Sequence, residues 1–169
     1  MAPRFAAIVL GLVLLACPAR TSQHAHEVSV EVDRVALDPR SGSPVVVLED
    51  RHGNRSLAIW IGFAEASSIA SEMDHDHPPR PNTHDLAKRL IDGLHGSVSR
   101  VVVTELRDGT YFAVMVLDAP GGAFEVDARP SDAIALALRT GAPLFVREAL
   151  FDAANSDPPS PPAADEHST

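Results

Sequence analysis

Strand-like segments occur along this chain in two groups of three, and not singly between helices. Alternation of apolar and polar residues predicts six strands, over 28–32, 44–49, 56–61, 98–106, 111–117 and 124–127. Asp108 and Gly109 predict a tight hairpin turn, because both turn positions must accept a positive φ. A short last strand is predicted over 144–146. Strands grouped in this way pair as hairpins, which favours an α+β fold with a mixed, mainly antiparallel sheet and argues against a doubly wound α/β fold.

Apolar residues that recur every three or four positions predict about three helices. The first is centred on Ala66–Met73. The second begins with Thr83 as its N-cap and is stopped by Gly96. The third begins at Pro130, a residue suited to the first helical position, and ends at Gly141. We expect the second helix to bury an apolar stripe made of Leu86, Leu90, Ile91 and Leu94.

The beginning of the chain is typical of an exported protein. Residues 1–19 read as a signal peptide, with Arg4 before the apolar run Phe5–Ala16, which is too short to span a bilayer comfortably. Three outcomes stay open: lipidation of Cys17 as the first mature residue, ordinary cleavage after Ala19, or an uncleaved anchor. The prediction is an exported protein, either periplasmic or anchored to the membrane as a lipoprotein through Cys17. Because Cys17 is the only cysteine, no disulfide can form within the chain.

Composition divides the rest of the chain into a tether at 20–26, one folded domain at 27–152 and a proline-rich tail at 153–169, which we expect to be disordered. The folded part carries 12 Lys and Arg against 20 Asp and Glu, a net charge of −8. This balance disfavours tight non-specific binding to a phosphate backbone, so any activity on nucleic acid needs a local patch or a bridging cation. A homo-oligomer is a further expectation, because hairpin strands leave edges to cover.

A first polar motif lies at the start of the second predicted helix, where Thr83, His84 and Asp85 follow one another. The N-terminus of a helix can hold a phosphate, and an imidazole there can act as a general acid or base. The alternative is structural: Thr83 caps the helix and Asp85 offsets its dipole.

A second polar motif lies between a strand and the third helix, over 127–132. Arg129 can clamp a phosphate with two hydrogen bonds, and Asp127 and Asp132 can hold Mg²⁺ through oxygen. The alternative is an internal Arg–Asp pair that locks the junction. Glu65 is a third candidate, whose simpler interpretation is an acid in the first turn of a helix.

One further group has the residue types of a metal site, the tract of alternating Asp and His over 74–77. It lies in a proline-rich loop with no ordered scaffold, and its number of ligands is not diagnostic. Its role stays open.

Three stretches together resemble the bifunctional nuclease (BFN) domain family. They are 47–66, with Val47-Leu-Glu-Asp50 and Ile59-Trp-Ile-Gly62; 79–112, with Pro79-Arg-Pro-Asn-Thr-His-Asp-Leu86; and 127–146, with Asp127-Ala-Arg-Pro-Ser-Asp132. In this order and spacing they cover nearly all of 27–152. The resemblance implies a nuclease, since the family takes its name from members that cut both DNA and RNA.

The resemblance and the two motifs lead to one predicted function, hydrolysis of phosphodiester bonds in nucleic acid assisted by a divalent metal. Glu65, Asp127 and Asp132 would hold Mg²⁺ or Mn²⁺. His84, beside Asp85, would transfer a proton, and Arg129 would hold the phosphate. The alternative is a non-enzymatic binding or assembly module at the bacterial cell envelope, in which the same polar residues serve the fold.

Overall fold

The structure is a computed structural model that describes residues 27–156. The predicted signal peptide, the lipidation site Cys17 and the tether at 20–26 lie outside the described residues, as does the tail from residue 157 onward. None of the helices within 27–156 has the length and apolar character that crossing a membrane requires.

The described chain folds into seven strands and four helices in the order βββααβββαβα. The strands are β1 (Glu27–Leu37), β2 (Pro44–Asp50), β3 (Ser56–Trp60), β4 (Ser97–Arg107), β5 (Thr110–Ala119), β6 (Gly122–Ala128) and β7 (Leu144–Arg147). The helices are α1 (Phe63–Met73), α2 (Thr83–Gly93), α3 (Pro130–Thr140) and α4 (Ala149–Ser156). Up to β7 the order of strands and helices is the predicted one.

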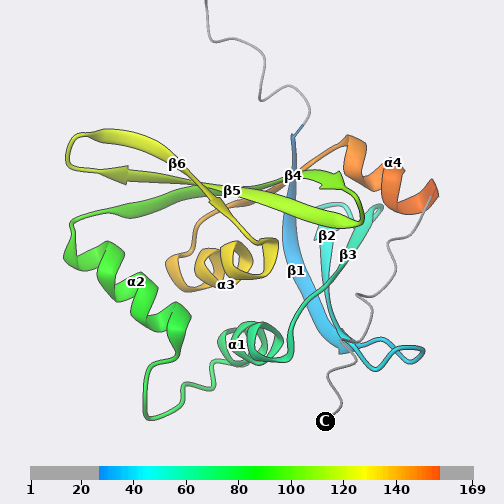
Figure 1. Ribbon diagram of the computed structural model, residues 1–169, viewed down its shortest axis with the longest axis horizontal. Coiled ribbons are helices and arrows are strands. Elements are labelled where there is room, and N and C mark those ends of the chain that lie inside the picture. The colour runs from blue at the N-terminus through cyan, green and yellow to red at the C-terminus, as the bar shows by residue number, and fades with distance from the viewer. Residues whose placement is uncertain (1–26, 157–169) are drawn as a thin grey trace, which may run out of the picture.

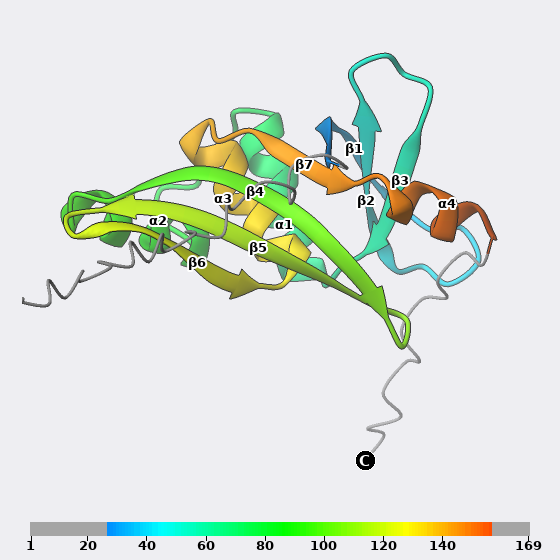
Figure 2. The same cartoon turned by 90° about the horizontal axis from the view of Figure 1, so that it is seen from above.

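All seven strands form a single curved sheet in the order β3-β2-β1-β7-β4-β5-β6 (Figure 2). Each neighbouring pair is antiparallel except β4 and β7, which run parallel. The predicted α+β class with a mixed, mainly antiparallel sheet is therefore confirmed. The turn between β4 and β5 is also as predicted, with φ of 51° at Asp108 and 74° at Gly109.

Helix α3 lies at the centre of the helical layer, with α1 and α2 beside it on the same side of the sheet (Figure 1). Its predicted ends are confirmed: Pro130 occupies the first turn, and Gly141 takes the left-handed conformation with φ of 68°. Its buried residues are mostly small, so α1 and the sheet can approach closely. The largest fully buried side chains of the core include Leu48, Leu57, Ile69, Ile134 and Phe151.

Three sequence predictions about helix α2 are wrong. Its N-cap is Asn82 and not Thr83, because the Asn82 side chain accepts hydrogen bonds from two backbone N–H groups of the first turn. It ends at Gly93, before the predicted stop at Gly96. The stripe predicted to be buried is largely exposed, at 52% for Leu86, 58% for Leu90 and 73% for Leu94.

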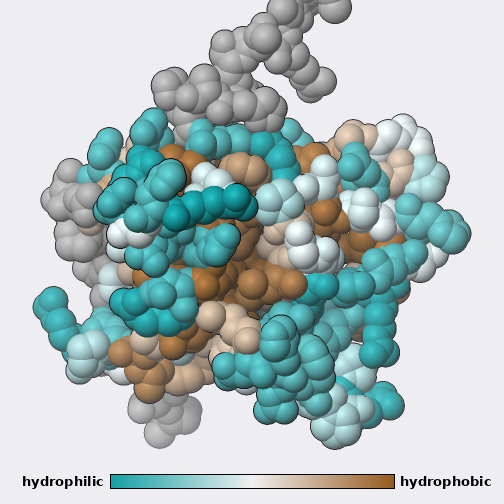
Figure 3. All heavy atoms as spheres, turned by 180° about the vertical axis from the view of Figure 1, so that it is seen from behind, coloured by the Kyte–Doolittle hydropathy of each residue, from teal (hydrophilic) through white to brown (hydrophobic). Residues whose placement is uncertain are grey.

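These leucines are exposed because a different face of α2 packs against the rest of the domain. The face that packs inward carries His84, Ala87 and Ile91, and His84 is only 9% exposed. A buried histidine next to exposed leucines inverts the usual rule for an amphipathic helix, and such an inversion is a common mark of a functional region. Apolar side chains also reach the surface in the middle of the face seen from behind (Figure 3).

Helix α4 is not predicted from the sequence. It buries Leu150 and Phe151, which are 5% and 2% exposed, against the part of the sheet near β3. It runs to Ser156 and so includes residues 153–156, which the sequence alone assigns to the tail.

Candidate functional site

Arg129 forms the solvent-facing end of a polar cluster where β6 passes into α3. It precedes Pro130 in an extended conformation, with φ of −64° and ψ of 141°, and its side chain is 67% exposed. Its Nε donates to Asp132 Oδ2 at 2.7 Å, and its Nη2 donates to Asp132 Oδ1 at 3.0 Å and to Glu65 Oε1 at 2.7 Å. A single guanidinium thus joins the first turns of α1 and α3.

His84 continues the cluster inward from Asp132. Its Nε2 lies 3.1 Å from Asp132 Oδ1, and its Nδ1 lies 2.8 Å from Ser68 Oγ. Both ring nitrogens therefore have partners, as expected for an imidazole removed from water. The position of the ring follows from its place in the first turn of α2, where the backbone N–H of His84 donates to Asn82 Oδ1 at 2.9 Å.

Asp132 is held as an anion by its neighbours. Burial alone would raise the pKa of this carboxyl, but hydrogen bonds from Arg129 and then from His84 outweigh burial, so the pKa of Asp132 is lowered. The side chain stays 31% exposed, so the carboxylate faces both the imidazole and the solvent.

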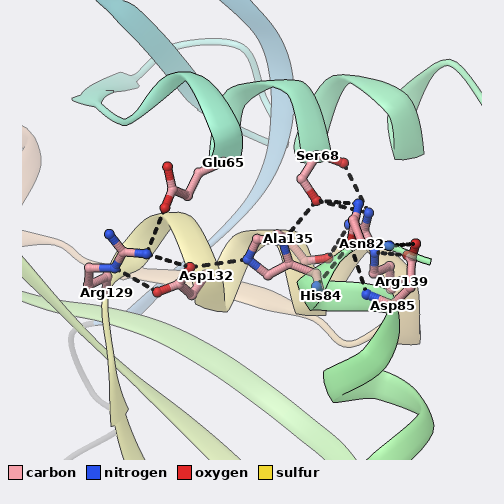
Figure 4. Close-up of polar contacts among 9 residues, drawn as sticks. All are labelled: Glu65, Ser68, Asn82, His84, Asp85, Arg129, Asp132, Ala135 and Arg139. Carbon is pink, nitrogen blue, oxygen red and sulfur yellow. Dashed lines mark hydrogen bonds and ion pairs between the residues drawn. The ribbon is translucent and has the colours of Figure 1, made fainter. Parts of the chain in front are cut away.

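The inner end of the cluster is built around Arg139, whose side chain is 4% exposed. Its Nε donates to Asp85 Oδ1 at 2.7 Å, and its Nη2 donates to Ser68 Oγ at 2.9 Å. The hydrogen bond from Arg139 lowers the pKa of Asp85. Figure 4 shows the result, a continuous line of polar contacts from Glu65 through α3 and the start of α2 to Asp85.

The structure gathers four of the residues singled out from the sequence: Glu65, His84, Arg129 and Asp132. Asp85 belongs to the same line but at its inner end, where it also accepts a hydrogen bond from the Asn82 backbone N–H at 2.9 Å. Asp85 thus forms a capping box with Asn82 at the start of α2.

Asp127 is not brought to the cluster. Its side chain is exposed and makes no hydrogen bond or ion pair within residues 27–156, although the residue pairs with Val114 of β5 in the sheet. Side chains alternate across a strand, and Val126 and Ala128 pack against the core, so Asp127 points to the opposite face of β6.

The predicted metal site is therefore not assembled in this arrangement. Glu65 and Asp132 both face the Arg129 guanidinium, which takes the place that a cation would have between them. Within residues 27–156, no three His, Cys, Asp or Glu side chains are grouped so that they could hold a metal ion, and this includes the tract at 74–77. Dependence on Mg²⁺ or Mn²⁺ stays a prediction.

Three residues of the cluster were not singled out from the sequence: Ser68, Asn82 and Arg139. The signal available for two of them was helical spacing. Ser68 lies three positions after Glu65, and Arg139 lies seven positions after Asp132, so each shares a helix face with a residue that was singled out.

Comparison with known proteins gives a consistent result. Residues 46–158 match the model of the bifunctional nuclease domain. Uncharacterized proteins from two strains of Mycobacterium tuberculosis are 41% identical over 122 residues, which is 72% of this chain and 73% of each relative. Bifunctional nuclease 1 of Arabidopsis thaliana is 32% identical over 112 residues, covering 63% of this chain and 34% of the plant protein.

Proposed function

Because the chain belongs to the bifunctional nuclease domain family, we propose that it hydrolyses phosphodiester bonds in nucleic acid at the cluster of Glu65, His84, Arg129 and Asp132. One observation carries the proposal: an exposed guanidinium is held by two carboxylates beside a buried imidazole. A plant relative of the chain is named as a nuclease, which supports the same reaction class.

Arg129 is the residue suited to bind the scissile phosphate. Its Nη1 has no hydrogen-bond partner among residues 27–156, so it can donate to a phosphate oxygen without breaking an existing bond. A fixed positive group is needed here, since the folded part of the chain has a net charge of −8 and repels a phosphate backbone elsewhere.

The two carboxylates on Arg129 are held unequally, and this suggests different roles. Asp132 accepts two hydrogen bonds from Arg129 and lies within hydrogen-bond distance of His84, whereas Glu65 accepts one bond from Arg129. Glu65 is thus the carboxylate that an incoming phosphate can displace, and once released it is placed to accept the proton of the attacking water. Asp132, supported by His84, keeps Arg129 in position.

The experiment is a cleavage assay on single-stranded DNA and RNA with the full chain, in EDTA and with added Mg²⁺ or Mn²⁺. We expect Asp132→Asn to lower cleavage at least about 100-fold, because the amide keeps the shape but loses the charge that orients Arg129. Asp127→Asn is the matched control, from the same motif but outside the cluster, and should leave cleavage unchanged. Cleavage in EDTA would support hydrolysis by the chain's own residues, and strict metal dependence would revive the metal-assisted mechanism.

A second candidate is a non-enzymatic binding or assembly module at the cell envelope. One observation favours it: polar groups of the cluster already have partners within the domain. This holds for the side chains of Asp85 and Asp132 and for both ring nitrogens of His84. In that case Asp132→Asn lowers the free energy of unfolding by roughly 1–3 kcal/mol, and a well-folded wild type cuts neither DNA nor RNA with any divalent ion.

A further inference from the structure

The Ser68 hydroxyl lies in the inner part of the cluster, with three polar groups within hydrogen-bond distance. We propose that Ser68 is a positioning residue that holds His84 in the neutral tautomer with its proton on Nε2. The argument counts donors and acceptors around the Ser68 oxygen, which is buried together with its residue at 5% exposure.

Two of the three groups can only donate to Ser68. Arg139 Nη2, at 2.9 Å, belongs to a guanidinium and has no acceptor capacity. Asn82 Nδ2, at 3.1 Å, is the amide nitrogen. The orientation of this amide is fixed from its other side, because Asn82 Oδ1 accepts the backbone N–H groups of His84 at 2.9 Å and Asp85 at 3.0 Å.

These two donors occupy both lone pairs of the Ser68 oxygen, so its own proton must point elsewhere. The partner in that direction is His84 Nδ1 at 2.8 Å. A helical hydroxyl often bonds instead to a carbonyl one turn back, as Thr140 does to Leu136 O at 2.8 Å, but Ser68 makes no such bond. The Ser68 hydroxyl therefore donates to His84 Nδ1.

A nitrogen that accepts a hydrogen bond carries no proton, so the proton of neutral His84 resides on Nε2 and is donated to Asp132 Oδ1 at 3.1 Å. His84 is thus a hydrogen-bond donor to the site and not its base. The consequence for hydrolysis rests on the proposed function. Because Nδ1 accepts the Ser68 hydrogen bond, His84 cannot act as the base, and a carboxylate must do so. Of Glu65 and Asp132, Glu65 is the less tightly held.

The tautomer can be measured without any activity, by long-range ¹H–¹⁵N correlation of the histidine rings in the ¹⁵N-labelled full chain near pH 7.5. The His84 signals are identified by their loss in His84→Gln. We expect Nδ1 to have the shift of a bare nitrogen and Nε2 that of a protonated one. A protonated Nδ1, an imidazolium or an averaged pair of shifts would overturn the proposal.

Three variants distinguish an effect of Ser68 on the His84 tautomer from an effect on the stability of the fold. Ser68→Ala removes the donor and should change the tautomer ratio by about tenfold, the size of one hydrogen bond. Ser68→Thr restores the hydroxyl and should restore the wild-type ratio. Ser67→Ala, at the exposed neighbouring serine, should change nothing. If Ser68→Ala keeps the wild-type shifts, Ser68 does not set the tautomer, whatever the cleavage assay shows.

Discussion

Arg55 and Arg129 each donate hydrogen bonds to two carboxylates, and the two arrangements differ in what lies beyond them. Arg55 donates to Asp50 Oδ2 at 3.0 Å and to Glu148 Oε1 at 3.1 Å, and it stacks over the Phe151 ring at 5.1 Å. Arg129 has the same kind of partners in Asp132 and Glu65. Their guanidinium groups therefore have the same chemistry in different surroundings.

The Arg55 arrangement is closed. The Asp50 side chain is 4% exposed and also accepts the backbone N–H groups of His52 and Asn54, so it fixes the turn between β2 and β3. The Arg129 arrangement is open: the guanidinium is 67% exposed, and its Asp132 partner leads on to an imidazole. In this domain the ion pair at the candidate site links solvent to a buried titratable group, whereas the structural ion pair ends in backbone N–H groups.

The largest effect expected from this comparison is on cleavage. Arg129→Ala should lower the rate of nucleic-acid cleavage by about 10²–10³-fold, because it removes the group that binds the phosphate. Arg55→Ala should change the rate by less than about twofold, since neither of its carboxylate partners, Asp50 and Glu148, contacts His84 or Arg129. Rates measured on the same labelled strand decide between them, and equal losses in both variants would remove the distinction.

Thermal stability should show the opposite order. Arg55→Ala leaves the buried Asp50 without its main partner, so the melting temperature should fall by at least about 4 °C. Arg129→Ala breaks ion pairs in which the arginine itself is 67% exposed; such pairs contribute little to folding, so the melting temperature should fall by less than about 3 °C. Differential scanning calorimetry is the measurement. A larger loss for Arg129→Ala would mean that its cluster is mainly structural.

Acid titration tests the Arg55 arrangement on its own. The hydrogen bond from Arg55 is the main cause that lowers the pKa of Asp50 below its ordinary value of 3.8. A lowered pKa in the folded state stabilises the protein above about pH 4, and this contribution is lost as the pH falls through the folded-state pKa. Asp50→Asn should therefore flatten the fall in melting temperature between about pH 4 and pH 2. An unchanged slope would contradict the assignment of Asp50.

The smallest expected effect concerns Gly62, the residue before α1. A Cβ at this position would lie 2.3 Å from Glu65 Oε2, and the backbone φ of −74° suits any residue. Gly62→Ala should therefore displace the Glu65 carboxylate from Arg129 and lower cleavage by about fivefold without strain in the backbone. Gly93→Ala, where nothing lies within 4 Å, is the control. Equal rates in the two variants would show that Glu65 is dispensable.

Local rules predicted the parts of the fold that depend on local chemistry. Pro130 and Gly141 mark the ends of α3, and Asp108 with Gly109 marks the hairpin, because proline fixes its own φ, whereas glycine and aspartate accept the positive φ that the helix end and the tight turn require. The inward face of α2 could not be predicted in the same way. Its buried residue is His84, which tolerates burial only because Ser68 and Asp132 reach it from other helices. The periodicity of apolar residues does not show which polar side chains of other helices will contact a residue.

The candidate site was predicted in part for the same reason. Polar residues at helix starts identified Glu65, His84, Arg129 and Asp132, whereas the buried Arg139 lies within a helix and gives no such signal. Asp127 could have been excluded from the sequence itself. Its neighbours Val126 and Ala128 are apolar and alternate with it along β6, which already places Asp127 on the solvent face.

Strand β7 is the last strand along residues 27–156 and yet lies in the middle of the sheet. Residues Leu144–Val146 pair on one side with Val28–Val30 of β1 and on the other with Val101–Val103 of β4. A nascent chain that has not reached Leu144 holds two hairpin groups whose facing edges are unpaired and rich in valine. We expect a ribosome-arrested chain of 140 residues or fewer to be cut readily by protease. A longer chain, with 156 or more residues clear of the ribosomal tunnel, should resist the protease. Resistance of the shorter chains would contradict this expectation. The two half-sheets can therefore join only after the segment that contains β7 has left the ribosome. The newborn domain then loses its tendency to aggregate edge to edge.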